Sequence, residues 1–296
     1  MSNLFSKLKE AISYHCLPDQ EAYLNQAAEA LRKDWSYLEP CSVPFEKVKV
    51  RSEVFIRKIT DSGRSVDAYV KIYAYRKHPF QRYLRKGRAI TEARNLLFFD
   101  SIDIQAPRVL AWGERRNRIG RIIQEFIITE AVPGAVQLIP FVKEHCPEPG
   151  RPVRRKIAEQ LGRWTRVMHD HGFVHEDLKW RNVLVRAKKD EPELFWIDCP
   201  IGGFLKPGLK LERKKLKDCA TLDKLARIEC SKEEREAFVK AYLGTDAAGD
   251  SIRHLCRRIE KYRSARFDAK DDRQRADAEK EKRSGKRAGR KSLWPQ

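Results

Sequence analysis

The sequence predicts an α+β fold in which a β-rich part precedes a larger α-rich part. Alternating apolar and polar residues with turn signals fill residues 45–75, whereas apolar residues three and four positions apart prevail beyond Pro152. Hydrophobic residues make up 41% of the 296 residues, which is enough to form a core and excludes a wholly disordered chain. No apolar run reaches the roughly 18 residues that a transmembrane helix needs.

The β-rich part is predicted to span residues 45–133. The segments KVKVRS, EVFIRKI and SVDAYVKIYAY read as antiparallel strands, and DSGRS predicts a hairpin turn at Asp61–Ser65. A helix is expected over RAITEARNLLFFDS, because Ile90, Ala93 and Leu96 share one stripe. After Pro107, the segments VLAWGE and RIIQEFIITE predict two more strands.

The α-rich part is predicted to span residues 134–263. A helix is expected over VRRKIAEQLGRWTRVMHDHG, which ends at Gly172. Two short β-like pieces, NVLVR and LFWID, follow it, and helices are then expected at 218–228, 232–242 and 251–262. Asp218 and Asp223 are expected to be structural acids that cap helices or brace loops.

Two appendages flank these parts. Residues 1–44 are predicted to be a helical extension, because Leu4, Leu8 and Ile12 lie at helical spacing. We expect this helix to pack on its own domain, and membrane docking is the alternative. Residues 264–296 form a charged, basic tail with few apolar residues, so an exposed helix or a disordered segment is expected.

Charge and cysteine content narrow the environment and the partners. The formal net charge of +20 indicates an anionic partner, namely nucleic acid, a phosphorylated metabolite or an acidic membrane surface. Seven scattered cysteines without a C-x-x-C pair predict neither a disulfide framework nor a zinc site, and they fit a reducing compartment. The N-terminus does not read as a secretory signal, so a cytoplasmic location is expected.

The segment HEDLKWRN carries the chemistry. His175, Asp177, Lys179 and Asn182 fall as H-x-D-x-K-x-x-N, and Asp198 ends the apolar piece LFWID downstream. An aspartate in a turn can accept a proton from a hydroxyl, and a lysine nearby can stabilise charge on a moving phosphoryl group. An asparagine oxygen and a second aspartate can hold Mg²⁺.

These motifs resemble the protein-kinase-like superfamily over residues 45–244, which implies a two-lobed protein-kinase-like fold. Within it the sequence is most similar to the lipopolysaccharide core kinases that act on heptose or Kdo. The segments VKIY and FIITEAVPG, the short stretch after Asp198 and the basicity carry this closer resemblance.

The resemblance implies roles for residues in both lobes. Lys71 would contact the α- and β-phosphates of ATP and Glu92 would pair with it, although Glu53 and Glu114 lie in the same lobe and stay open as partners. Backbone groups at Glu130 and Val132 would meet the adenine.

In the α-rich lobe, the implied catalytic residues are Asp177 as base, His175 bracing the loop, and Lys179. Asn182 and Asp198 would hold Mg²⁺.

The sequence departs from protein kinases in three ways. No G-x-G-x-x-G precedes Lys71, Asp198 is followed by Cys199 and Pro200 rather than by F-G, and no A-P-E is present. These differences favour a small-molecule or glycan acceptor. The expected activity is ATP- and Mg²⁺-dependent phosphorylation of heptose or Kdo in an anionic lipopolysaccharide precursor, with peripheral contact to the inner membrane.

Other functions remain open. A kinase for another small-molecule or protein acceptor, and a non-catalytic kinase-like binding module, are the alternatives. The basic stretch YRKHPFQRYLRKGR reads as a solvated loop, as a surface for an anionic saccharide lipid, or as a nucleic-acid surface. No DNA partner is expected, and RNA is less favoured than glycolipid.

Overall fold

The computed structural model describes residues 11–16, 50–61, 64–75, 87–116, 120–188, 191–244 and 246–268. The strands are β1 (Ala11–Cys16), β2 (Val50–Asp61), β3 (Arg64–Tyr75), β4 (Val109–Arg116), β5 (Ile122–Glu130), β6 (Ala135–Gln137), β7 (Phe173–Val174), β8 (Val183–Arg186), β9 (Glu193–Trp196) and β10 (Gly203–Phe204). The helices are α3 (Arg88–Ser101), α4 (Leu138–His145), α5 (Pro152–Asp170), η3 (Trp180–Asn182), α6 (Leu209–Glu229), α7 (Lys232–Leu243), α8 (Gly249–Arg263) and the π-turn η4 (Ser264–Asp268).

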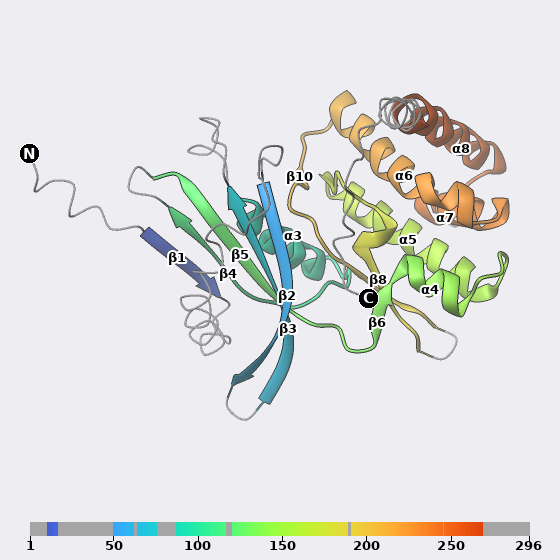
Figure 1. The fold of residues 1–296 in the computed structure, drawn as a ribbon. Helices are drawn as coiled ribbons and strands as arrows, with labels where there is room; N and C mark the ends of the chain where they lie inside the picture. Colours follow the sequence, from blue (N-terminus) through green and yellow to red (C-terminus); the bar gives the residue numbers. More distant parts are fainter. Residues whose placement is uncertain are drawn as a thin grey trace, which may run out of the picture.

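The β-rich part is a five-stranded antiparallel sheet in the order β1-β4-β5-β3-β2. The predicted hairpin is confirmed: Val50 pairs with Tyr75, and Asp61 pairs with Arg64 next to the turn. Helix α3 contacts β3, β4 and β5, and it lies between the sheet and the helical part (Figure 1). The strand that carries Lys71 is therefore an inner strand beside this helix.

The N-terminal helix prediction is wrong for the residues that can be checked. Ala11–Cys16 forms β1, which pairs antiparallel with β4 from Ala11 opposite Arg116 to Cys16 opposite Ala111. The segment AISYHC contains β-branched and aromatic residues, and hydrogen bonds to a sheet edge outweigh a weak helical periodicity. The rest of the predicted helix lies outside the described residues.

The α-rich part follows the turn after β5 and contains α4 to α8 with two small sheets (Figure 1). The predicted pieces NVLVR and LFWID are confirmed as β8 and β9, which pair from Val183 opposite Trp196. Helix α4 was not predicted, and α6 begins at Leu209, nine residues before the predicted helix at 218. Pro140 in the first turn of α4 is compatible with a helix, because the first N–H groups have no intrahelical partner.

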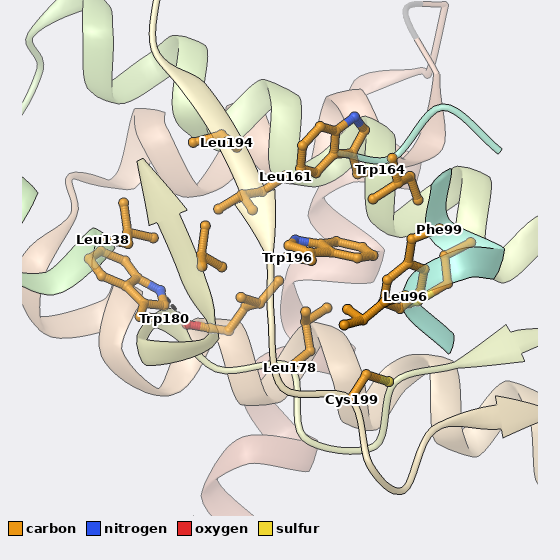
Figure 2. Packing of buried hydrophobic residues seen from close by; sticks show 14 of the residues in the cluster. Leu96, Phe99, Leu138, Leu161, Trp164, Leu178, Trp180, Leu194, Trp196 and Cys199 are labelled. Carbon is orange, nitrogen blue, oxygen red and sulfur yellow. Dashed lines mark hydrogen bonds between the residues drawn. The ribbon is translucent and has the colours of Figure 1, made fainter. Parts of the chain in front are cut away.

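One aromatic cluster joins α3 to the α-rich part. Trp196 is fully buried; its ring lies 5.3 Å from that of Phe99 on α3 and 5.7 Å from that of Trp164 on α5, in both cases edge to face. Figure 2 shows these rings with Leu96 beside them. Such pairs add to the stabilisation from buried area, so the orientation of α3 is fixed from both sides.

Some predictions remain untested. Residues 76–86 of the basic stretch and residues 269–296 of the tail lie outside the described residues, as do residues 1–10 and 17–49. Among the helices that the structure describes, none combines the length and the apolar character that crossing a bilayer requires.

Candidate active site

Lys71 lies in a polar cluster between β3 and α3. Its Nζ is 3.1 Å from Oε2 of Glu92 and 2.5 Å from Oδ1 of Asp198. Because side chains alternate along a strand, Tyr73 lies on the same face of β3 as Lys71. Its hydroxyl donates to Oε2 of Glu92 over 2.6 Å. The fold therefore brings together Lys71, Glu92 and Asp198, which were predicted to form one site.

The structure also decides between the candidate partners of Lys71. Glu92 is buried and makes the pair, whereas Glu114 on β4 pairs with Arg116, with 2.6 Å between Nε and Oε1. The side chain of Glu53 lies outside the described residues.

The electrostatics of the cluster keep Lys71 charged. Burial alone would lower the pKa of Lys71, but the carboxylates of Glu92 and Asp198 outweigh it, and the pKa is raised. Burial raises the pKa of Tyr73, so the phenol remains a neutral donor. A partly buried lysine that stays protonated is suited to an anionic ligand such as a phosphate group.

The first turn of α3 is held by a carboxylate from β5. Glu125 accepts hydrogen bonds from the backbone N–H groups of Arg88 (3.0 Å) and Ala89 (3.1 Å), which have no partner within the helix. A Cβ on Gly87 would lie 1.6 Å from Oε1 of Glu125, so a residue with a side chain there would force the carboxylate away. This contact fixes the start of α3 and thereby the position of Glu92 one turn later.

A second residue of α3 reaches the segment after Asp198. Asn95 lies three positions after Glu92 and shares its helix face. Its Nδ2 donates to the carbonyl oxygens of Cys199 (2.8 Å) and Gly202 (3.0 Å). Asp198 itself has a φ of 60°, in the left-handed region that non-glycine residues seldom adopt. Helix α3 thus holds both the ion pair and the backbone that presents Asp198.

Asp177 and Asn182 lie in the loop between β7 and β8. The Nδ2 of Asn182 donates to the backbone carbonyl of Asp177 over 2.9 Å. The ammonium group of Lys179 contacts Oδ1 of Asp177, and Arg181 lies 3.9 Å from Oδ2. The side chain of Asp177 is 27% exposed, so its carboxylate is accessible to a ligand.

A buried acid on α6 holds this loop. Asp218 is fully buried, and its carboxylate accepts from the backbone N–H groups of His175 (2.7 Å) and Glu176 (2.9 Å). The predicted structural role of Asp218 is confirmed. Asp223 is structural as well, since it pairs with Arg235 and Arg263.

The grouping of His175 with the catalytic residues needs a correction. Its side chain is fully buried and stacks on Phe99, with ring centroids 6.0 Å apart. Burial lowers the pKa of His175 more than nearby carboxylates raise it, so the imidazole is neutral. A fully buried ring cannot touch a substrate, which leaves His175 only the loop-bracing part of its predicted role.

Asn182 and Asp198 are neighbours across two strands. The N–H of Ile197 donates to the backbone carbonyl of Asn182 over 3.0 Å, so Asn182 just before β8 and Asp198 just after β9 lie at the same end of this strand pair. Because Nδ2 of Asn182 is used by the loop, its amide oxygen is the group left for a cation. One carboxylate and one amide oxygen are oxygen ligands of the kind that Mg²⁺ prefers, so these two residues fit such a cation.

Comparison with known proteins adds to this geometry. The family model described as "Lipopolysaccharide kinase (Kdo/WaaP) family" matches residues 63–242, which is more than half of the chain. The chain belongs to this family. The matched range contains Lys71, Glu92, Asp177, Asn182 and Asp198.

Two individual proteins show the extent of the likeness. The KEOPS complex subunit Bud32 of Pyrococcus abyssi is 28% identical over 130 residues, 44% of this chain and 51% of that protein, so the chain spans about half the length of this relative. A solved structure described as WaaP in complex with acyl carrier protein aligns with a TM-score of 0.54 and 21% identity. The alignment covers 85% of this chain and 99% of that chain. The predicted α+β, protein-kinase-like fold is confirmed.

The hinge that the resemblance to this family implies lies at the end of β5. The N–H of Glu130 donates to the carbonyl of Arg108 (2.8 Å), and that of Ala131 donates to Asp67 (2.7 Å). Since β5 pairs with β3, the hinge and Lys71 lie on neighbouring strands. Within the described residues, the N–H of Val132 donates to no backbone carbonyl, and adenine recognition by Glu130 and Val132 stays a prediction.

Sequence reasoning missed four residues that position the site: Tyr73, Asn95, Glu125 and Glu176. Two of them carried a signal, because Tyr73 shares a strand face with Lys71 and Asn95 shares a helix face with Glu92. Glu125 and Glu176 carried none, since their partners come from elements distant in the sequence. The carboxylate of Glu176 contacts Lys214 and Lys217 of α6.

Proposed function

We propose that this chain is an ATP- and Mg²⁺-dependent kinase that phosphorylates a heptose or Kdo hydroxyl of the lipopolysaccharide inner core. The observation that carries the proposal is the convergence of two groups of residues in a chain of this family. Lys71 and Glu92 from the sheet and α3 meet Asp198, while Asp177 and Asn182 are presented by the adjoining loop.

Each residue has a role that follows from its surroundings. Lys71, held charged by Glu92, would bind and orient the phosphates of ATP. Asn182 and Asp198 would hold Mg²⁺, which when bound neutralises charge on the β- and γ-phosphates. Asp177 would orient the acceptor hydroxyl and take its proton while the sugar oxygen bonds to the γ-phosphorus. The bond to the bridging oxygen then breaks and ADP leaves.

Lys179 supports the same step. Its ammonium group contacts the Asp177 carboxylate and is 41% exposed, so it can also reach an incoming phosphoryl group. We propose that it stabilises the charge of the transferred group, for which positioning and electrostatics supply most of the catalysis.

We also propose that the enzyme works at the cytoplasmic face of the inner membrane, in peripheral contact with it. Two features support this proposal. The net charge is +20, and anionic lipids attract basic proteins. The segment from Asp198 to α6 exposes three apolar side chains, Ile201, Phe204 and Leu209.

The test is phosphate transfer to lipopolysaccharide core purified from a strain that lacks this kinase. Asp177→Asn should lower kcat by about 10²- to 10⁴-fold, because it removes the proton acceptor. Asp170→Asn is the matched control: Asp170 is an exposed acid on α5, and its loss should leave the rate unchanged. Full activity of Asp177→Asn would disprove its role, and a wild type that transfers no phosphate to the core would disprove the proposed acceptor.

A further inference from the structure

One face of α6 next to the catalytic loop is strongly basic. Its side chains follow the spacing i, i+3, i+4, i+7 and therefore lie together; they are Lys210, Arg213, Lys214 and Lys217. With Arg266 from the turn after α8, they line a cavity of about 400 Å³. The other described residues that line it are Leu209 and Tyr262, so no carboxylate lines it. Helices α6 and α8 run side by side at this place (Figure 1).

The positive charge of the cavity is only partly compensated. Lys214 and Lys217 both contact the carboxylate of Glu176. Lys210, Arg213 and Arg266 have no ion pair with any residue that the structure describes. Among the described residues, the five cations that line the cavity are offset by one carboxylate, that of Glu176, which leaves an excess of four positive charges.

This cavity is tied directly to the proposed catalytic base. Nζ of Lys217 donates to both the backbone carbonyl and the carboxylate of Glu176, each over 2.6 Å, and Glu176 immediately precedes Asp177. Burial alone would raise the pKa of Glu176, but the two lysines outweigh it, and the pKa is lowered. The carboxylate thus stays charged and keeps the basic face of α6 against the catalytic loop.

A solvated helix face explains only part of this arrangement, because Lys210, Arg213 and Arg266 are exposed whereas Lys214 and Lys217 are partly buried. Like charges three and four positions apart destabilise a helix, and this face contains four such pairs. The side chains of Lys214 and Lys217 are only 31% and 15% exposed, so they lie inward rather than in solvent. Cations that are held together at a cost in stability, beside a catalytic loop, indicate an anionic ligand.

We propose that this cavity, the α6 anion subsite (Lys210, Arg213, Lys214, Lys217 and Arg266), binds an oxyanion carried by the acceptor. The oxyanion is a phosphate monoester or a carboxylate, and its binding lets Asp177 orient a hydroxyl of the same molecule. The nucleotide phosphates belong with Lys71 and Asp198, which come from β3 and the loop after β9. The subsite deepens the proposed function and rests on it.

The first test separates binding of the acceptor from chemistry. The acceptor is water-soluble, deacylated lipopolysaccharide core, used with saturating Mg²⁺ and ATP. The double variant Lys210→Gln/Arg213→Gln should raise KM for this acceptor by about ten-fold or more, with kcat and KM for ATP within two-fold. The control Lys240→Gln/Arg257→Gln removes the same charge from exposed positions on α7 and α8 and should behave as wild type. An unchanged acceptor KM in the first variant overturns the subsite.

Two treated acceptors identify the oxyanion. Acceptor stripped of phosphate by hydrofluoric acid should raise the wild-type KM to that of the variant if a phosphate is bound. Acceptor with reduced carboxyl groups should do so if a carboxylate is bound. If neither treatment raises the wild-type KM, the subsite is disproved.

The second test does not depend on transfer, so it separates failure of the subsite from failure of the proposed function. Inorganic phosphate is added to protein saturated with Mg²⁺ and a non-hydrolysable ATP analogue, and the melting temperature is measured. Phosphate should stabilise the wild type and the control but not the variant. Equal shifts in all three proteins, or none in the wild type, overturn the subsite. A third outcome also overturns the subsite: the variant loses binding to phosphatidylglycerol vesicles while its KM for the lipopolysaccharide core is unchanged. That outcome would indicate that these residues contact the membrane instead.

Discussion

Asn95 is predicted to couple α3 to the loop that presents Asp198, and its replacement tests this coupling. Asn95 is buried, with 6% of the residue exposed. Its Nδ2 donates to two carbonyl oxygens, those of Cys199 and Gly202. Asn95→Ala leaves both carbonyl groups without this donor. Each buried group left unpaired costs about 1–3 kcal/mol, so the expected loss for the two groups is about 2–6 kcal/mol in the free energy of unfolding.

Asn95→Asp should be worse than Asn95→Ala. An ionised carboxylate has no donor, and it would face two carbonyl oxygens and lie one turn from Glu92 in a buried place. For a chain of this size, 1 kcal/mol corresponds to a change of about 2–4 °C in Tm. Asn95→Ala should therefore melt about 4–24 °C below the wild type, and Asn95→Asp should melt lower still.

The assays are thermal unfolding and phosphate transfer well below the melting temperature of each variant. In the folded variants kcat/KM should still fall, because the loop after Asp198 has lost its tie to the helix that carries Glu92. The control is Arg94→Ala, at the exposed position just before Asn95, which should change the free energy of unfolding by no more than about 0.5 kcal/mol. If the melting temperature of Asn95→Asp equals or exceeds that of Asn95→Ala, the two hydrogen bonds do not hold the loop.

Two further predictions concern the same framework. Gly87→Ala should lower the free energy of unfolding by about 2–4 kcal/mol in urea titrations, because the new Cβ would displace Glu125 from the start of α3. The control is Gly203→Ala, because nothing lies within 4 Å of a Cβ at that position. Equal stability of the two variants would refute the close approach of Glu125 to Gly87. His175 has a pKa that burial lowers, so its contribution to stability is present above the unfolded value of about 6.5 and is lost as the pH falls toward the folded pKa. In urea titrations between pH 7 and pH 5, the free energy of unfolding should fall less steeply for His175→Phe than for the wild type. One titrating group changes this free energy by at most about 1.4 kcal/mol per pH unit. An unchanged slope would contradict a lowered pKa of His175.

Local patterns explain why part of the site could be predicted from the sequence. The hairpin that carries Lys71 is signalled by alternation and by turn residues a few positions apart, and α3 is signalled by its apolar stripe. The loop motif and Asp198 gave a resemblance, and the resemblance supplied the roles. The choice of Glu92 over Glu114 needed the structure, because it depends on how α3 is rotated against β3.

Contacts between distant segments explain why the rest could not be predicted. Glu125 reaches the start of α3 from a strand 36 residues away, and Asn95 reaches Cys199 over 104 residues. Both residue types are common on protein surfaces, so nothing local marks them as buried. The N-terminal strand was missed for the same reason: AISYHC becomes a strand because β4 offers an unpaired edge, which its own sequence does not show.

The basic residues show the same limit for function. The sequence shows a basic stretch before α3 and a basic tail, but nothing local distinguishes the cations at 210–217 from an ordinary solvated helix face. What changes this interpretation is one acid, Glu176. A carboxylate that precedes the proposed base and binds two of these lysines makes α6 part of the acceptor side of the site. If the basic face served solubility alone, its lysines would have no need of a partner inside the catalytic loop.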